Sequence, residues 1–416
     1  MLILSINCGS SSIKSALIDS EDGRRLLEVR VENIGSSNAV LRIDDARSDV
    51  HARNQSEALQ LLVRTIGSAA ENAGPVEAVA HRIVHGGERF TRATRIDDHA
   101  LQLLAHVEHL APLHNPPALA ALRYMRSVFS AVPHVALFDT AFHTTLPPHA
   151  REYALPADVR RRYGIRRYGF HGISHAHVMQ SVSEALSVEP QSLRIISCHL
   201  GAGASVAAIE FGRSIDTSMG MTPLEGLVMA TRAGDVDAGV LLHLLYAGMD
   251  VGHLDEVLNR RSGLLGLAST NDMRTIESRA AEGDESCKLA KTMYSHRVRK
   301  YIGAYAALMR GVDAIAFTAG VGENSAGIRH DCTQGLDFLG ASLDQDRNRN
   351  VVLTASSPIA QISQGQSGVR IFVVRADEEQ AMARETAALL ESNDDQSMIS
   401  AIQQNSVMAS RERPPL

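Results

Sequence analysis

The chain carries the same local design twice, and this repetition limits the folds that it can adopt. Residues 2–18 and 194–209 each consist of a short apolar run, a turn of glycine and small residues, and a second apolar run. Such a pattern predicts a β-hairpin in each place. A chain of 416 residues also exceeds what one hydrophobic core usually holds, so two domains are expected. The sequence therefore predicts duplicated α/β domains that close on a shared ligand.

The first hairpin has a turn that is suited to phosphate. Its sequence, Asn7-Cys8-Gly9-Ser10-Ser11-Ser12-Ile13-Lys14, offers hydroxyls, backbone N–H groups, an amide and one Lys. These groups are the ones that pair with phosphate oxygens. The alternative is a solvated hairpin turn that binds nothing, since serine-rich turns are common.

A glycine-rich segment at residues 314–325, AIAFTAGVGENS, predicts a second type of ligand contact. An apolar strand, Ala314–Phe317, ends before Gly320 and Gly322, and Asn324 and Ser325 can cap a following helix. Glycines let a backbone approach a base or a phosphate closely, and a helix N-terminus favours negative charge. The segment predicts a nucleotide contact, although glycine-rich turns without a ligand also follow many strands.

Charged residues stand at the ends of other predicted elements. Arg82 lies at the end of a strand over 76–84, before two glycines, which places it more often at a cleft than in a core. Asp139 follows a strand over 132–138 and is either an Mg²⁺ ligand or a helix cap. Asp377-Glu378-Glu379 begins a helix, where carboxylates are also favoured by the helix dipole. The histidines at 81 and 85, and those at 171, 175 and 177, favour other roles than metal binding.

Composition excludes several classes of function. A net charge of −6 argues against broad nucleic-acid binding, and no basic block suggests a membrane surface. No apolar run reaches transmembrane length, and the first residues lack the basic leader of a signal peptide. The four cysteines are scattered without a C-x-x-C pair, which predicts free thiols and a cytoplasmic protein.

The motifs together resemble the acetate kinase family, from Asn7 to about Thr386. The segments that carry the resemblance are NCGSSSIK, HRIVHGGERF, APLHNPP, FDTAFH, YGFHGISH, CHLGAGAS, TPLEGL, TRAGD, FTAGVGEN and DEEQAMARET. The resemblance implies an α/β fold of two duplicated actin- and sugar-kinase-like (ribonuclease H-like) domains around a nucleotide cleft. It implies an acyl- and phosphate-side domain at 1–142 plus 377–416 and a nucleotide-binding domain at 143–376. It also implies a cytoplasmic homodimer that takes part in acetyl-CoA biosynthesis.

The implied reaction is the reversible, direct in-line transfer of a phosphoryl group between ATP and acetate, giving ADP and acetyl phosphate with Mg²⁺, or Mn²⁺ in its place. The groups implied in catalysis are Arg82, Asp139, His171 and Arg232. The residues implied at the acetate are Arg82, Val84, Leu113, His114, Phe170 and Pro223. Those implied at the Mg²⁺ are Asn7, Asp139 and Glu378. Phosphate contacts are implied for Asn7, Ser10, Ser12 and Lys14 and for His199, Leu200, Gly201, Ala202 and Gly203. Adenosine contacts are implied for Asp272, Met273, Arg274, Gly320, Val321, Gly322, Glu323 and Asn324.

The chemistry of phosphoryl transfer agrees with these roles without the resemblance. The reaction depends on charge neutralisation at the equatorial oxygens of the phosphoryl group more than on covalent chemistry. Acetate is ionised at neutral pH, so no general base is required. The chain departs from the family at Ala202, where an Asn is usual, and at Met273, where a Phe is usual. The first change removes an amide from the second hairpin, and we expect an altered phosphate contact there.

Two other functions remain open on the sequence. One is a propionate or butyrate kinase of the same family, since one methylene is worth only about 1–3 kcal/mol in discrimination. The other is a chaperone-like or sensory nucleotide-binding module without acyl-phosphate chemistry. Such a module has no use for Arg82, His171 and Arg232 together, so their presence favours the enzyme.

Overall fold

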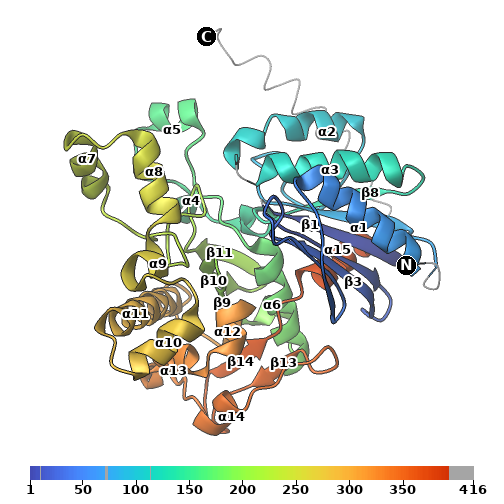
Figure 1. The fold of residues 1–416 in the computed structure, drawn as a ribbon. Helices are drawn as coiled ribbons and strands as arrows, with labels where there is room; N and C mark the ends of the chain where they lie inside the picture. Colours follow the sequence, from blue (N-terminus) through green and yellow to red (C-terminus); the bar gives the residue numbers. More distant parts are fainter. Residues whose placement is uncertain (10, 71–73, 113, 393–416) are drawn as a thin grey trace. The chain divides into compact units, whose positions relative to one another are not determined.

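The structure is a computed structural model that describes residues 1–9, 11–70, 74–112 and 114–392. The chain divides into two compact units. The first unit contains Met1–Ala141 and the segment from Asp377 onward, and the second contains Phe142–Ala376. Figure 1 shows the elements of both units in sequence colours. Each unit is described by itself.

The first unit is built on an eight-stranded sheet in the order β5-β4-β3-β2-β1-β6-β8-β7. Its strands are β1 (Leu2–Cys8), β2 (Ile13–Asp19), β3 (Arg25–Glu32), β4 (Val40–Ile43), β5 (Ala46–Asp49), β6 (Ala78–Ile83), β7 (Thr94–Arg95) and β8 (His134–Phe138). Strands β1 to β5 are joined as antiparallel neighbours, whereas β1, β6 and β8 are parallel. The carboxyl ends of these three parallel strands therefore share one edge of the sheet.

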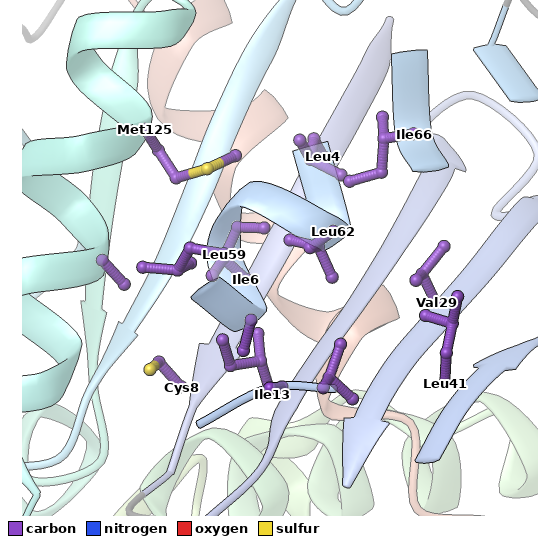
Figure 2. Packing of buried hydrophobic residues seen from close by; sticks show 14 of the residues in the cluster. Leu4, Ile6, Cys8, Ile13, Val29, Leu41, Leu59, Leu62, Ile66 and Met125 are labelled. Atoms are coloured by element: carbon purple, nitrogen blue, oxygen red, sulfur yellow. The ribbon is translucent and has the colours of Figure 1, made fainter. Parts of the chain in front are cut away.

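Helices cover both faces of this sheet. They are α1 (Gln55–Ala70), α2 (Asp98–Ala105), α3 (Asn115–Val128) and α15 (Glu378–Glu391), with the 3-10 turn η1 (Glu108–Leu110). Leu59, Leu62 and Ile66 of α1 pack against Leu4 and Val29 of the sheet, as Figure 2 shows. Because strand side chains alternate, the other buried residues of β1 point to the opposite face, where α15 contacts β1, β2 and β6.

The second unit has a six-stranded sheet in the order β11-β10-β9-β12-β14-β13. Its strands are β9 (Arg194–Leu200), β10 (Ala204–Glu210), β11 (Arg213–Thr217), β12 (Ala314–Thr318), β13 (Ile359–Gln361) and β14 (Arg370–Val374). Strands β9 and β10 form the second predicted hairpin, and β9, β12 and β14 are parallel. The segment between β11 and α7 contains no regular element and carries both Pro223 and Arg232.

The remaining helices belong to the second unit. They are α4 (Pro148–Arg151), α5 (Ala157–Tyr163), α6 (Gly172–Leu186), α7 (Ala238–Tyr246), α8 (Val251–Arg260), α9 (Gly263–Ala268), α10 (Met273–Ala281), α11 (Glu285–Leu308), α12 (Ala319–Asn324), α13 (Ala326–Thr333) and α14 (Gln345–Arg349). The 3-10 turns are η2 (Ala141–Thr145), which begins one residue before the unit, η3 (Pro190–Ser192) and η4 (Asp337–Leu339). Val178 and Val182 of α6 pack on Ile195, Ala207 and Ala316 of the sheet. Helix α11 contacts β9 and β10.

The two sheets share one strand order, and the predicted duplication is confirmed. The series β3-β2-β1-β6-β8 in the first unit corresponds to β11-β10-β9-β12-β14 in the second. In each series the first three strands form two antiparallel pairs, and the last two strands then join the sheet in parallel. This is the α/β fold class that the repeated hairpins predicted.

The structure corrects three local predictions. Residues 319–324, expected as a glycine-rich turn, form the short helix α12, in which Ala319 has a left-handed φ of 66°. Ser325 does cap the next helix, because its hydroxyl accepts from the backbone N–H of Ile328 at 3.0 Å. The sequence also predicts a helix over residues 56–72 with Ser56 as its cap, but α1 already begins at Gln55, so Ser56 is not the cap. The polar residues 20–55, which the sequence left unassigned, supply β3, β4 and β5.

Candidate functional site

A cluster of charged side chains lies at the shared edge of β1, β6 and β8 in the first unit. Arg82 donates from Nε to Asp139 Oδ1 at 2.9 Å and from Nη2 to Asp139 Oδ2 at 2.6 Å. Its Nη1 lies 3.2 Å from Asn7 Oδ1 and 3.2 Å from Glu378 Oε2. Asn7 Nδ2 in turn donates to Glu378 Oε2 at 3.3 Å. Four residues that the sequence placed in catalysis or metal binding are therefore in direct contact.

The electrostatics of this cluster favour a cation. Burial alone lowers the pKa of the Arg82 guanidinium, but the Asp139 and Glu378 carboxylates raise the pKa more and leave it above its ordinary value. One guanidinium stands against two carboxylates, so the cluster keeps a net negative charge. Because Asp139 is buried and Arg82 is held by both carboxylates, the arginine has little freedom to leave them for a substrate anion.

The other predicted site residues of the first unit have local surroundings that differ from those of the charged cluster. Lys14 is exposed on β2 and stands directly opposite Asn7 in the hairpin register. The backbone carbonyl of Ser12 accepts from the Gly9 N–H at 2.8 Å, which closes the hairpin turn. Val84 follows the end of β6, and His114 precedes the first residue of α3. Ser10 and Leu113 lie outside the described residues.

His171 anchors a second cluster, in the other unit. It occupies the N-cap position of α6 with a left-handed φ of 58°, which is rare for a residue with a side chain. Its Nδ1 lies 2.9 Å from Ser205 Oγ, and its ring stacks on His199 with 4.1 Å between the ring centroids. An unfavourable backbone conformation that the surroundings impose on a polar residue is typical of functional sites.

The glycines of the second hairpin leave space between His171 and Arg232. A Cβ atom added to Gly203 would lie 3.3 Å from His171 Nε2 and 3.6 Å from Arg232 Nη1. A Cβ on Gly201 would lie 3.7 Å from His199 Nε2. The hairpin backbone thus runs directly past two nitrogen groups that the sequence predicted to meet phosphate. Leu200 is buried, and Ala202 lines the pocket described below.

Arg232 is a half-buried cation with no carboxylate partner among the residues that the structure describes. Its Nη1 donates to the Pro223 carbonyl at 3.3 Å and contacts the Met229 sulfur at 3.8 Å. Burial lowers the pKa of Arg232 below its ordinary value, because the guanidinium loses contact with water. An uncompensated guanidinium beside an imidazole is suited to receive an anion with several oxygens.

A pocket of about 480 Å³ opens beside this hairpin. Its walls come from the hairpin, α9, α10 and α12, which belong to one unit. The lining residues are Gly201, Ala202, Ala230, Leu264, Asn271, Asp272, Met273, Arg274, Glu277, Gly320, Val321, Asn324 and Ser325. Two segments predicted to contact adenosine, around 272–274 and 320–324, therefore meet at one pocket together with the phosphate hairpin.

Two other predicted nucleotide residues lie behind the pocket wall. Gly322 is buried on α12, where it packs against Phe317 and Leu200. Glu323 accepts from the backbone N–H of Ala376 at 2.9 Å. Both residues therefore fix α12 in place. Of the predicted acetate residues in this unit, Phe170 is buried and Pro223 is half-buried.

Sequence reasoning missed part of the site. Ala230, Leu264 and Glu277 line the pocket but carry no motif that distinguishes them from ordinary residues. His175 and Ser205 were recognisable in principle, since His175 stands in α6 four residues after its N-cap His171, and Ser205 is the second residue of β10. Their hydrogen bonds come from tertiary packing.

The described residues contain neither a clustered metal site nor a membrane-spanning helix. No group of three or more His, Cys, Asp or Glu side chains is arranged to hold a metal ion within residues 1–392, the gaps excepted. Among the helices in the described part of the chain, none has the length and apolar character needed to cross a membrane. The Asn7, Asp139 and Glu378 cluster has two carboxylates and an amide, so it falls below that size.

The duplicated sheets and the pocket beside a glycine hairpin define the class. This is an α/β protein of two units that share one strand order, and the second unit holds the pocket beside its glycine hairpin. The model of the acetokinase family matches residues 2–384, and the chain belongs to that family.

Relatives along the whole chain agree with this assignment. The acetate kinase of Halothermothrix orenii is 42% identical over 94% of this chain and 100% of its own length. The acetate kinase of Thermotoga maritima is 44% identical over 94% of this chain and 99% of its own length. The crystal structure of Porphyromonas gingivalis acetate kinase has a TM-score of 0.86 and 37% identity, covering 94% of this chain and 100% of that one. A propionate kinase from Francisella tularensis also has a TM-score of 0.86, with 36% identity over 92% of this chain and 98% of its own.

Proposed function

We propose that the protein transfers a phosphoryl group between ATP and acetate, giving acetyl phosphate and ADP. The observation that carries this proposal is Arg232, a partly buried cation that has no carboxylate partner in the described part of the chain and lies with His171 beside Gly203. The transferred phosphoryl group carries charge on three equatorial oxygens in the transition state. Arg232 and the His171 Nε2 edge would neutralise that charge and donate hydrogen bonds to it.

ATP is assigned to the pocket of the second unit. Its hairpin wall, Gly201 and Ala202, carries no bulky side chain, so a phosphate can approach the backbone closely, and Met273 and Val321 offer an apolar surface for a base. Asp272 also caps α10, because its side chain accepts from the Arg274 N–H. Ala202 leaves this wall without an amide side chain, so phosphate contacts there depend on the backbone.

Mg²⁺ is assigned to the cluster of the first unit. Asp139 and Glu378 supply carboxylate oxygens and Asn7 an amide oxygen, and Mg²⁺ prefers oxygen ligands. Mg²⁺ also keeps several waters and binds substrate phosphates, so one or two protein carboxylates suffice. When bound, the ion neutralises charge on the phosphate oxygens. Arg82 holds both carboxylates in place and limits the net negative charge of the cluster.

Acetate is assigned to the apolar residues Val84, Phe170 and Pro223, with His114 and with Leu113, which lies outside the described residues. The bound carboxylate is already ionised at neutral pH, so attack on phosphorus needs orientation rather than proton removal. A second candidate substrate is propionate, because a propionate kinase shares this fold at 36% identity.

We also propose a homodimer that functions in the cytoplasm. Every residue of α7 is at least partly exposed, although the helix consists almost entirely of apolar residues. The side chain of Tyr246 is 88% exposed and that of Val251 is 73% exposed. A contiguous apolar patch of this kind is typical of a protein interface, and a second copy of the chain is the proposed partner. The four cysteines are buried free thiols, which supports a reducing compartment.

The test is a hydroxamate assay for acyl phosphate with ATP and Mg²⁺, run with acetate, propionate and butyrate. We expect acetate to have the highest kcat/KM and propionate to be used less well. Highest kcat/KM with propionate would replace the assigned substrate. Binding of ATP without acyl phosphate from any of the three acids would overturn the enzymatic proposal in favour of a nucleotide-binding module.

A further inference from the structure

A continuous chain of side-chain hydrogen bonds runs behind His171. Ser197 Oγ lies 2.8 Å from His175 Nδ1, and His175 Nε2 lies 2.8 Å from Ser205 Oγ. Ser205 Oγ lies 2.9 Å from His171 Nδ1. Ser197 and Ser205 stand on the neighbouring strands β9 and β10, and His175 stands on α6, which packs against them. Strand and helix therefore fix all four groups in one row.

His175 is a neutral link in this chain. The residue is fully buried, and both of its ring nitrogens are engaged by serine hydroxyls. Burial lowers the pKa of His175 well below its ordinary value, and the nearby His143 and His199 lower it further. A neutral imidazole carries one N–H, so one ring nitrogen of His175 donates and the other accepts.

Ser197 is the last residue in this row of hydrogen bonds, and it determines which atom is the donor in each of them. Ser197 is fully buried, and among the described residues its hydroxyl has His175 Nδ1 as its sole side-chain partner. If His175 Nδ1 carried the proton, the Ser197 hydroxyl hydrogen would be buried without an acceptor, which is costly. Ser197 therefore donates to Nδ1, and the proton of His175 is on Nε2.

The same assignment of donors and acceptors extends to the hydrogen bond between Ser205 and His171. Because His175 Nε2–H donates to Ser205 Oγ, the Ser205 hydroxyl is free to donate its own hydrogen to His171 Nδ1. His171 then accepts at Nδ1 and carries its proton on Nε2. This nitrogen is the one that lies beside Gly203 and Arg232.

We propose that Ser205 is a positioning residue for His171, with His175 and Ser197 behind it. The chain of hydroxyls and imidazoles selects the tautomer of His171 that presents an N–H donor to the phosphoryl oxygens. The opposite tautomer would present a lone pair to an anion and would repel it. This inference rests on the proposed function for its catalytic consequence, whereas the tautomer itself is a property of the free protein.

The kinetic test compares three variants of the full chain. Ser205→Ala removes the donor to His171, and Ser205→Cys restores a weak donor of similar size. Ser214→Ala is the matched control, because Ser214 is also fully buried and lies 2.8 Å from a histidine, His143 Nδ1, outside this chain of bonds. We expect Ser205→Ala to lower kcat about ten- to hundred-fold, the scale for loss of a group that orients a reacting side chain. We expect KM for ATP and acetate to change little and Ser205→Cys to recover part of the loss.

The direct test is long-range ¹H–¹⁵N NMR of the histidine rings in the wild-type protein, with the His171 signal assigned through His171→Gln. We expect His171 to be protonated on Nε2 and to lose this preference in Ser205→Ala. A wild-type His171 protonated on Nδ1, or a kcat for Ser205→Ala equal to that of Ser214→Ala, would overturn the inference. If Ser205→Ala does not fold, the wild-type spectrum decides alone. A wild type with the expected tautomer and no acyl phosphate would instead contradict the proposed function.

Discussion

At the scale of single residues, two arginines that look alike in the sequence have opposite surroundings. Arg82 is held by Asp139 and Glu378, whereas Arg232 contacts only a carbonyl and a sulfur within the described residues. Loss of each arginine should therefore affect activity and stability differently. An ion pair that is broken on one side leaves a buried charge, while removal of an unpaired cation leaves none.

We expect Arg232→Ala to lower kcat by roughly 10²–10³, the scale of a lost oxyanion donor, without loss of folding stability. Arg82→Ala should also lower kcat and should reduce the free energy of unfolding by about 3 kcal/mol, because Asp139 loses its partner. Turnover assays and urea unfolding measure both effects, and Arg213→Ala, an exposed site, is the control. A normal kcat for soluble Arg232→Ala would remove this residue from the mechanism.

Val84 is predicted to limit substrate size. Arg82 and Val84 are both partly exposed, while His81, Ile83 and His85 are buried, as alternation along an extended chain requires. Val84→Ala removes two methyl groups from the proposed acyl pocket. We expect kcat/KM for propionate relative to acetate to rise roughly ten-fold, the effect of one to two methylenes. Val128→Ala, an exposed site, is the control. If the ratio of kcat/KM for propionate to that for acetate is the same in Val84→Ala, Val128→Ala and wild type, Val84 does not line the pocket.

At the scale of elements, helix α15 brings a distant carboxylate to the edge of the first sheet. Asp377 caps the helix by accepting from the Gln380 N–H, and Glu378 then faces Asn7 and Arg82. Its neighbour Glu379 faces Arg25 instead, at 3.8 Å. Two adjacent residues of the helix thus carry the carboxylate assigned to Mg²⁺ and a structural one.

We expect Glu378→Gln to raise the Mg²⁺ concentration for half-maximal activity about ten-fold or more, because a proposed ligand loses its charge. Glu379→Gln is the matched control on the same helical turn and should keep the wild-type Mg²⁺ dependence. The measurement is an Mg²⁺ titration of kcat at saturating ATP and acetate. Superimposable titrations of the two variants would leave Glu378 with a structural role only.

Strands β6 and β8 are joined by a buried histidine pair that makes stability depend on pH. His81 Nε2 lies 2.9 Å from His134 Nδ1, and the two rings stack. Burial lowers the pKa of His81 well below its ordinary value of 6.5, and His134 and Arg126 lower it further. Burial likewise lowers the pKa of His134. Below pH 6.5 the unfolded chain binds more protons than the folded one, so stability is present at neutral pH and is lost as the pH falls.

The slope is about 1.4 kcal/mol per pH unit for one such histidine. We expect His81→Phe to flatten the loss of stability below pH 6.5 by about this amount, because a titrating group is removed. Urea unfolding at several pH values measures the slope, with the exposed residue His51 changed to Gln as the control. An unchanged slope in His81→Phe would mean that the pair does not set the acid limit.

At the scale of the whole molecule, exposed apolar surface predicts an assembly. Leu242 and Tyr246 are four residues apart on α7, so they lie on one face of the helix, and both are exposed. We expect Leu242→Glu combined with Tyr246→Glu to convert a dimer into monomers, since charges in an apolar interface are costly. Sedimentation velocity measures the mass, and Phe338→Glu, also exposed, is the control. A wild-type monomer would contradict the proposed homodimer.

The sequence by itself determined much of the fold and of the residue types in the site. The hairpins at β1–β2 and β9–β10, the strand β12 and the cap at Ser325 were predictable because alternation, glycine and capping residues act within a few positions. The ten motifs of the family also located Arg82, His171, Arg232 and the adenosine segment at 320–324. Local rules failed at residues 20–55 and at α12, where strand pairing and helix packing outweigh local preference.

Only the tertiary structure decided what each polar group contacts. The pairing of Arg82 with Asp139 and Glu378 joins residues from three distant segments. That Arg232 has no such partner among the described residues is equally invisible in a list of residues. The donor and acceptor roles in the hydrogen bonds from Ser197 to His171 depend on the buried Ser197 hydroxyl at the end of the row. Charge state and tautomer follow from desolvation and from hydrogen bonds that have to be counted in space, and these quantities exist only after the chain has folded.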